Sequence, residues 1–326
     1  MRDRQDSSVA AKITIFAAVA VPGLFLAFIA ASVQAQEIEP RAYSNAPVGV
    51  NFLIASYAYA EGGVAIDPSL PVTNADIRYH SAVLAYARSL NLWGRSGKFS
   101  AIIPYGWISG TAELAGQPQQ RKISGMGDAR FRFSVNFFGA PALSLKEFGN
   151  YRQDTIIGAS LELTVPTGQY DPNKLVNNGT NRWSLKPEIG LSKAWGPLTA
   201  ELSAAARFFS DNHDFLNGST REQDPIYSFQ GDLIYAFHSG VWMAVTGTYL
   251  AGGRTEVDGV SNDDLQKNSR LGVTLALPVN RYNSIKLYAS TGVATRTGGD
   301  YNLVGIAWQV RWGGGLGSQY RPDADR

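Results

Sequence analysis

Charged side chains recur at every second position in several segments of this chain. In residues 126–137, Asp128, Arg130 and Arg132 alternate with alanine and phenylalanine. Successive side chains of a β-strand point to opposite faces, so such a segment would carry one charged face and one apolar face. A charged face of this kind can select a solute by its charge, or hold neighbouring strands together through ion pairs.

The candidate site is the set of charged residues that share this face. Neighbouring strands lie less than about 5 Å apart, so acidic and basic members of the set would form a ladder of ion pairs across a sheet. Such a ladder would line a lumen that selects a solute, or its paired charges would fill and stiffen a narrow interior. The predicted members are Asp128, Arg130, Arg132, Glu162, Arg182, Lys186, Glu188, Glu201, Arg207, Asp232, Arg270, Lys286 and Arg296, and Arg88 is expected on the same face.

Catalysis has less support in the sequence than a lumen. The histidines are His80, His213 and His238, and only His213 has neighbouring carboxylates, Asp211 and Asp214, that could orient it as a base. No nucleophile motif accompanies them. We therefore predict that the chain is not an enzyme, and a hydrolase that uses His213 is the remaining alternative.

Metal and cofactor sites are not expected either. The chain has no cysteine, which excludes disulfides and thiolate-bound metals. Residues 258–264 are rich in oxygen ligands but lack the spacing of a calcium-binding EF-hand loop, so a solvated turn is the interpretation. Asn178-Gly179-Thr180 matches a glycosylation sequon, which we expect to be idle in a bacterial setting.

An export signal precedes these segments. Residues 1–12 are charged, residues 13–31 are almost entirely apolar, and a small-residue cleavage site ends at Ala35. An uncleaved membrane anchor is the alternative, but the Pro22-Gly23 pair interrupts the apolar run and favours cleavage. The mature chain would then begin near residue 36 in an exported protein.

The composition narrows the class of protein further. The net charge of +2 gives no basic face for nucleic acid. Beyond the leader there is no apolar run of about 18 residues, so membrane-spanning helices are not expected. An aromatic content of 11% and a mean hydropathy of −0.12 suit a membrane β-barrel, in which only every second strand residue meets lipid.

The alternating pattern predicts an antiparallel transmembrane barrel of about twelve strands in a Gram-negative outer membrane. Connections alternate between short and long, as periplasmic turns and outer loops do in such barrels. The alternative, a soluble β-sandwich, has strands of about five or six residues, shorter than these. The predicted strands are 48–61, 78–92, 99–110, 126–138, 154–165, 182–195, 198–209, 226–237, 241–251, 268–279, 284–296 and 301–312.

Three local patterns resemble a known family. They are Gly125-Met126-Gly127-Asp128, Pro166-Thr167-Gly168-Gln169-Tyr170, and Asn181-Arg182-Trp183 with Pro187 and Gly190. In this order they resemble the outer-membrane β-barrel transporter family associated with the MetA pathway of phenol degradation, over roughly residues 47–312. The resemblance implies a channel for small aromatic or otherwise hydrophobic compounds. The arginine-rich lumen predicted from the strands suits carboxylates or polar solutes at least as well.

Together these observations predict an outer-membrane channel for passive uptake of small organic solutes. The expected organisation is a signal peptide (1–35), a periplasmic N-terminal segment (36–47), the barrel (48–312) and a periplasmic tail (313–326). The sequence leaves open whether residues 36–46 enter the lumen as a plug or trail in the periplasm. Expected partners are outer-membrane lipid, the solute and the barrel-assembly machinery. A structural barrel with a lumen closed by its own ion pairs is the nearest alternative.

Overall fold

The computed structural model describes residues 39–62, 72–114, 117–174, 176–298 and 300–317. The predicted leader, residues 1–35, lies outside these ranges. The described chain is almost entirely β-structure, with one short helix, α1 (Leu145–Phe148). No helix among these residues is long and apolar enough to cross a membrane.

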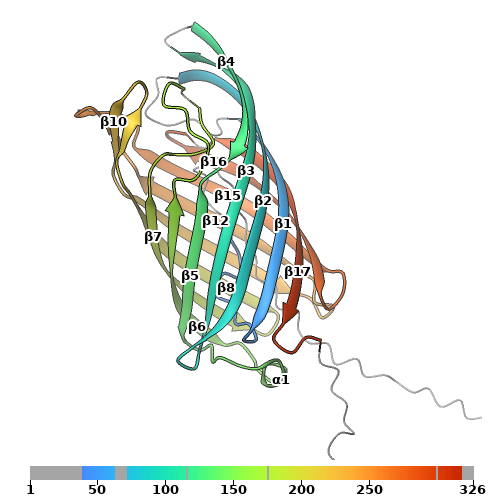
Figure 1. Cartoon of the computed structure of the whole chain (residues 1–326). Coiled ribbons are helices and arrows are strands. Elements are labelled where there is room, and N and C mark those ends of the chain that lie inside the picture. The colour runs from blue at the N-terminus through green and yellow to red at the C-terminus, as the bar shows by residue number, and fades with distance from the viewer. Residues whose placement is uncertain (1–38, 63–71, 115–116, 175, 299, 318–326) are drawn as a thin grey trace, which may run out of the picture.

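One closed antiparallel barrel of 12 strand positions dominates the structure (Figure 1), which confirms the predicted fold class. β1 pairs with both β2 and β17, and the β2–β3 pairing completes the ring. β4 and β5 share one position, because both pair with β3 at different heights. The strands are β1 (Val50–Gly62), β2 (Val72–Leu92), β3 (Arg95–Leu114), β4 (Gln117–Met126), β5 (Ala129–Phe138), β6 (Thr155–Val165), β7 (Ser184–Trp195), β8 (Leu198–Phe209), β11 (Ile226–Ala236), β12 (Trp242–Gly252), β15 (Gln266–Pro278), β16 (Asn283–Thr295) and β17 (Tyr301–Gly313).

The two ends of the barrel differ in their connections. One end carries α1 and tight turns such as residues 93–94 and 196–197, and the other carries the long connections (Figure 1). Outer-membrane barrels have short turns on the periplasmic side and longer loops outside. We therefore call the end with α1 the periplasmic end.

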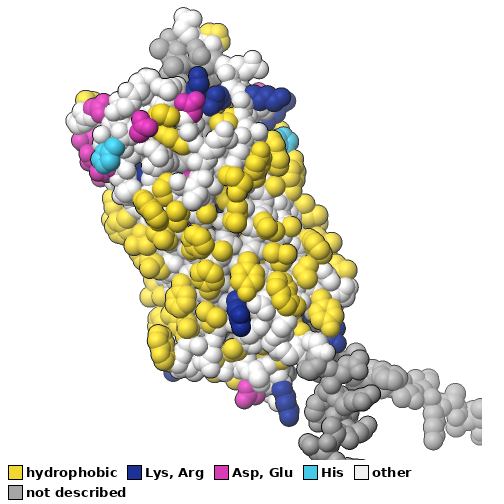
Figure 2. Space-filling model, in the orientation of Figure 1, with side chains coloured by type: hydrophobic (Ala, Val, Ile, Leu, Met, Phe, Trp, Pro, Cys, Tyr) yellow, Lys and Arg dark blue, Asp and Glu magenta, His cyan; other side chains and the backbone are white. Residues whose placement is uncertain are grey.

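Along the strands, side chains on the outer surface alternate with side chains that face the interior, as expected for strands that span a membrane. In β12, Met243 and Val245 are 43% and 42% exposed, whereas Ala244 between them and Trp242 and Thr246 on either side are buried. Figure 2 shows apolar side chains as a broad belt across the middle of the visible face, with charged side chains gathered towards its ends. A soluble sandwich would bury this face, so the belt is the lipid-facing surface.

Two of the long outer connections, predicted as loops, form a second sheet. It contains β9 (Asn212–Phe215), β10 (Ser219–Gln223), β13 (Thr255–Val257) and β14 (Val260–Ser261). These strands are short and lie above the membrane belt, where both faces of a strand meet polar surroundings. The hydrophobic alternation that identifies the barrel strands is therefore absent from them.

Carboxylates of residues 258–264 hold this outer sheet together. Asp258 accepts a hydrogen bond from the backbone N–H of Thr220 at 2.8 Å, and Asp264 accepts from the backbone N–H of Thr255 at 2.9 Å. The Thr220 N–H, together with the Ser219 hydroxyl, lowers the pKa of Asp258 from its ordinary value of 3.8. The oxygen-rich segment therefore cross-links loops.

The predicted strands 99–110 and 126–138 leave the polar residues Gln117-Pro118-Gln119 in a connecting loop, but these residues belong to β4. β4 pairs with the outer part of β3, up to Leu114 opposite Gln117, and extends the hairpin beyond the barrel. Outside the membrane neither face of a strand must be apolar, so periodicity does not reveal it. Pro118 is tolerated because β4 lies at the edge of the sheet.

Candidate functional site: the lumen

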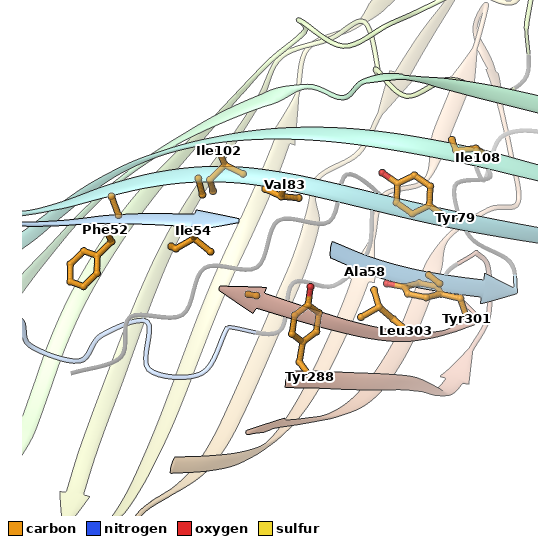
Figure 3. Packing of buried hydrophobic residues seen from close by; sticks show 14 of the residues in the cluster. Phe52, Ile54, Ala58, Tyr79, Val83, Ile102, Ile108, Tyr288, Tyr301 and Leu303 are labelled. Atoms are coloured by element: carbon orange, nitrogen blue, oxygen red, sulfur yellow. The ribbon is translucent and has the colours of Figure 1, made fainter. Parts of the chain in front are cut away.

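The lumen has two unlike walls. One wall consists of the inward side chains of β1, β2, β3, β16 and β17, which form a buried apolar cluster (Figure 3). We call it the apolar wall. It contains Val50, Phe52, Ile54, Ala58, Ala60, Ile77, Tyr79, Val83, Ala85, Ala87, Ile102, Ile108, Tyr288, Tyr301, Leu303 and Ala307.

The opposite side is charged, and its inward side chains come from β5 to β8. Arg132 Nη2 lies 2.6 Å from Glu188 Oε1, and Lys186 Nζ lies 3.2 Å from the other oxygen of the same carboxylate. Arg207 Nη2 lies 3.0 Å from Glu162 Oε1. We call this surface the charged wall. The Arg132–Glu188 and Arg207–Glu162 pairs cross between strands, whereas Lys186 and Glu188 both lie on β7.

A pair of carboxylates continues the polar surface onto β8 and β11. Glu201 and Asp232 lie directly opposite each other in the strand register. The Ser192 hydroxyl donates to Glu201 at 2.9 Å, and the Thr246 hydroxyl donates to Asp232 at 2.5 Å. Both carboxylates are buried, so these donors stabilise charge that would otherwise be costly away from water.

Most of the predicted site residues lie on the inward face. Arg182 is buried at the outer end of the barrel, with its guanidinium 4.2 Å from the Phe209 ring centroid. Arg270 packs over the Tyr301 ring at 3.7 Å, so it joins the charged side to the apolar wall. The residues on the inward positions of the strands are Arg130, Arg132, Glu162, Lys186, Glu188, Glu201, Arg207, Asp232, Arg270 and Lys286.

Two arginines do not lie where the sequence predicts. Arg88 is exposed, because the buried positions of β2 around it are Ala87 and Ser89. β2 has apolar residues on both faces, so a rule that assigns the polar face to the lumen selects the wrong side. Arg296 follows the end of β16 and pairs with Asp263 of the outer loops at 2.8 Å, where it is exposed.

Asp128 is buried, and it anchors the connection formed by residues 166–180, which we call the mouth loop. Its carboxylate accepts from the backbone N–H groups of Gly168 at 2.9 Å and Thr180 at 2.8 Å, and from the Thr180 hydroxyl at 2.6 Å. Gly168 also packs against Gly179, whose α-carbon lies 2.6 Å from the place that a Cβ on Gly168 would occupy. Two of the patterns that resemble the family, Gly125–Asp128 and Pro166–Tyr170, thus meet the sequon Asn178-Gly179-Thr180 at one loop anchor.

The mouth loop lies against β3 and β4 at the outer end of the barrel. The Asn178 side-chain amide donates to the carbonyl of Gly106 on β3 at 3.4 Å, and Arg121 Nε on β4 donates to the carbonyl of Val176 at 3.4 Å. The Val176 side chain packs against the apolar wall. The loop therefore adds an apolar contact at the outer end of the barrel.

Residues 39–46, which we call the strap, lie in the lumen rather than trailing in the periplasm. Glu39 pairs with Arg132, and the Tyr43 hydroxyl donates to Glu188 at 2.8 Å. On the opposite side, the Arg41 guanidinium lies 5.4 Å from the centroid of the Trp242 ring on β12. The strap thus spans the lumen from β5 to β12.

Two glycines make room for the strap. A Cβ on Gly190 of β7 would lie 1.9 Å from Cε2 of Tyr43, and one on Gly158 of β6 would lie 2.7 Å from Cδ1 of the same ring. At the periplasmic end, the Asn45 amide donates to the carbonyl of Pro141 at 3.1 Å. The strap carries one acidic residue, Glu39, and one basic residue, Arg41. These two charges are the sequence signal that could have suggested that the segment binds a lumen with both basic and acidic side chains.

The histidines lie apart from the charged wall. His80 Nδ1 lies 2.5 Å from the Tyr57 hydroxyl, and both residues are on the outer surface of β1 and β2. His213 Nδ1 lies 3.4 Å from the Thr220 hydroxyl within the outer sheet. This contact places His213 in loop packing between β9 and β10.

Comparisons with solved structures find outer-membrane proteins. An outer membrane channel of Pseudomonas putida F1 matches with a TM-score of 0.72 and 22% identity, over 85% of this chain and 100% of that chain. The β domain of the Bordetella autotransporter Brka matches with a TM-score of 0.46 and 8% identity, over 81% of this chain and 100% of its own. No curated protein matches the sequence.

The family described as "Putative MetA-pathway of phenol degradation" matches residues 60–308, which includes nearly all of the barrel. The mouth-loop anchor and the charged wall lie within the matched part, and the strap precedes it. The chain is an outer-membrane β-barrel and belongs to this family.

Proposed function

We propose that the protein is a channel for passive uptake of small organic solutes that combine an apolar, often aromatic, body with an acidic or polar group. The observation that carries this proposal is the pair of unlike walls in one lumen. A structural barrel needs only a filled interior. Separate apolar and charged surfaces that face each other suit a solute with both kinds of surface.

The charged wall would orient such a solute during passage. Arg130, Arg132 and Arg207 come from strands β5 and β8 and provide guanidinium groups for a carboxylate or phenolate. The apolar wall would accept the ring or hydrocarbon part on the opposite side. Passage needs binding that is favourable enough to enter and weak enough to leave, and several moderate contacts along a lumen meet that condition.

The relatives support the same class of function. The structure from Pseudomonas putida F1 is described as an outer membrane channel, and the family is described by a pathway of phenol degradation. A channel that serves degradation of aromatic compounds would carry solutes with the two kinds of surface that this lumen has. The chemical type of solute that we propose is inferred from the residues of the apolar wall and the charged wall.

A structural barrel is the second candidate, and the strap favours it. The strap and the ion pairs of Glu188 with Arg132 and Lys186 occupy the lumen beside β5 to β7. A lumen that stays filled would conduct neither ions nor solutes.

Uptake into proteoliposomes separates the two candidates. The refolded mature protein is reconstituted, and entry of radiolabelled benzoate is compared with entry of a sugar of similar size. The neutral acid form of benzoate crosses lipid by itself, so entry into empty liposomes is subtracted for each solute. The channel proposal predicts that the protein then adds faster entry of benzoate than of the sugar. A folded barrel that admits neither solute would contradict it.

A further inference from the structure

The strap carries a carboxylate into the most basic part of the lumen. Arg132 makes three contacts there: Nη1 with Glu39, Nη2 with Glu188 at 2.6 Å, and Nε with the Ser160 hydroxyl at 3.0 Å. The last two partners belong to the barrel wall itself. The third contact, at Nη1, is made by Glu39, which precedes the barrel strands in the chain.

A second cation faces the strap from β3. Lys98 Nζ donates to the carbonyl oxygen of Ala42 at 3.0 Å, and its side chain is buried. Arg132 and Lys98 therefore both bind oxygen atoms of the strap. Two cations on neighbouring strands that converge on oxygen atoms form a site suited to a carboxylate.

The aromatic ring of the strap occupies an adjoining slot. Tyr43 lies on the backbone of Gly158 and Gly190, where neither strand has a side chain, and its hydroxyl donates to Glu188. The strap thus presents a carboxylate and a phenol ring side by side. These are the groups of an aromatic acid, the solute type that the two walls suit.

We propose that Arg132 and Lys98 form a carboxylate-binding site of the solute path, and that Glu39 occupies it as an internal ligand. An incoming organic carboxylate exchanges with Glu39, and the strap leaves the lumen when it does. This inference rests on the proposed channel function, which it deepens by naming the binding site and the way a solute opens it.

Mass action sets the concentration at which exchange occurs. A tethered group competes at an effective concentration in the millimolar range, so a free carboxylate must reach roughly millimolar levels to displace it. The free carboxylate binds only when the strap is out, so it shifts the population towards the open state. An uncharged solute of the same shape has no such differential affinity for the site.

Thiol labelling measures the exchange, because the chain has no cysteine of its own. Ser44 of the strap is 3% exposed, so Ser44→Cys reacts with a maleimide only when the strap leaves the lumen. The purified full-length mature variant is labelled with and without benzoate at about 10 mM, and with benzamide as the uncharged isostere. Ser239→Cys, in an exposed turn, serves as the always accessible control.

The proposal predicts that benzoate raises the labelling rate of Ser44→Cys roughly two- to tenfold and that benzamide does not. The added substitution Arg132→Gln should abolish the effect of benzoate, whereas Arg296→Gln, which alters an exposed arginine paired with Asp263 in the outer loops, should retain it. If Arg132→Gln fails to fold, Glu39→Gln replaces it. That variant should label about tenfold faster without any ligand, because the strap has lost its charged contact.

An unchanged labelling rate in benzoate would overturn the exchange mechanism. An equal response with benzamide, or with the Arg132→Gln variant, would overturn the assignment of the site. Uptake into proteoliposomes is measured on the same preparation. Uptake without a benzoate effect on labelling refutes this inference alone, and absence of uptake refutes the channel itself.

Discussion

The role of each charged residue in this barrel depends on the groups that it contacts. Arg132 lies between two carboxylates in the lumen, Asp128 accepts three hydrogen bonds from a loop, and Arg296 pairs with Asp263 in the outer loops. All three occupy even positions of predicted strands, so spacing alone assigns each of them to the polar face. Their roles differ because they lie at different heights relative to the membrane boundary. The alternation of residues in the sequence does not give that height.

Loss of the Asp128 carboxylate should loosen the mouth loop. Asp128→Ala leaves two backbone N–H groups and a hydroxyl without their acceptor, so we expect a loss of about 1.5–3 kcal/mol in unfolding free energy. The measurement is urea unfolding in detergent, followed by the gel mobility of the folded barrel. Asp154→Ala is the control, since this exposed residue pairs with Lys193 at the surface and should cost less than about 1 kcal/mol. Equal losses in both variants would contradict the anchor.

Arg207 and Arg88, which the sequence places on the same face, should differ in their effect on ion selectivity. Arg207→Gln removes a charge from the lumen, and at about 4 Å in water such a charge contributes about 1 kcal/mol. We therefore expect the anion-to-cation permeability ratio to fall about fivefold. Arg88→Gln, on the outer surface, should leave the reversal potential unchanged. A shift of the same size for Arg88→Gln would show that its side chain reaches the ion path.

At the scale of elements, the strap lies inside the lumen, and the mouth loop and the outer sheet lie at its outer end. The strap occupies part of the lumen through the contacts of Glu39, Arg41 and Tyr43. The mouth loop lies against β3 at the outer end. The barrel strands that hold them have a clear alternating pattern. The strap and the mouth loop have no such alternating pattern, because each packs against both polar and apolar surfaces.

A methyl group at Gly190 should expel the strap while the barrel stays folded. The Cβ of Gly190→Ala would lie 1.9 Å from the Tyr43 ring, so the ring must move away from β7. We expect a larger single-channel conductance, with the heat-dependent gel shift of the folded barrel unchanged. Gly247→Ala is the matched control, because nothing lies within 4 Å of its Cβ. Conductance that stays at the wild-type level in both variants would mean that the strap is not docked by this contact.

The outer sheet should loosen in acid. The hydrogen bond from Thr220 lowers the pKa of Asp258 below 3.8, so the ionised carboxylate is favoured in the folded loop. Its contribution is present above the unfolded pKa and is lost as the pH falls through the lowered folded pKa. Hydrogen exchange of the Thr220 amide, corrected for intrinsic rates, should therefore lose protection below about pH 4. The Asp258→Asn variant should show no such pH dependence; a wild-type profile in that variant would refute the assignment.

For the whole molecule, the sequence predicts the barrel well and its interior only in part. The strands from β5 to β8 have charged inward faces, and their alternation gives both their positions and their orientation. β1 to β3 are apolar on both faces, since Phe52, Ile54 and Ile102 line the apolar wall. Their weak alternation therefore marks a second kind of lumen surface, and it explains the wrong face predicted for Arg88.

The apolar wall changes the expected solute. An arginine-rich lumen by itself suits hydrophilic anions, whereas a lumen with one charged and one apolar wall suits amphipathic ones. The resemblance to a family of phenol degradation and the charge pattern predict different solutes from the sequence alone. The two walls of the structure accommodate both properties in one molecule.

The most direct test of this account is the single-channel current of the mature protein and of Gly190→Ala in planar bilayers, with gradients of potassium chloride and potassium benzoate. The account predicts discrete steps, a reversal potential that favours anions, current carried by benzoate, and larger steps in Gly190→Ala. A correctly folded barrel that conducts neither chloride nor benzoate in both proteins would contradict a solute path through the lumen.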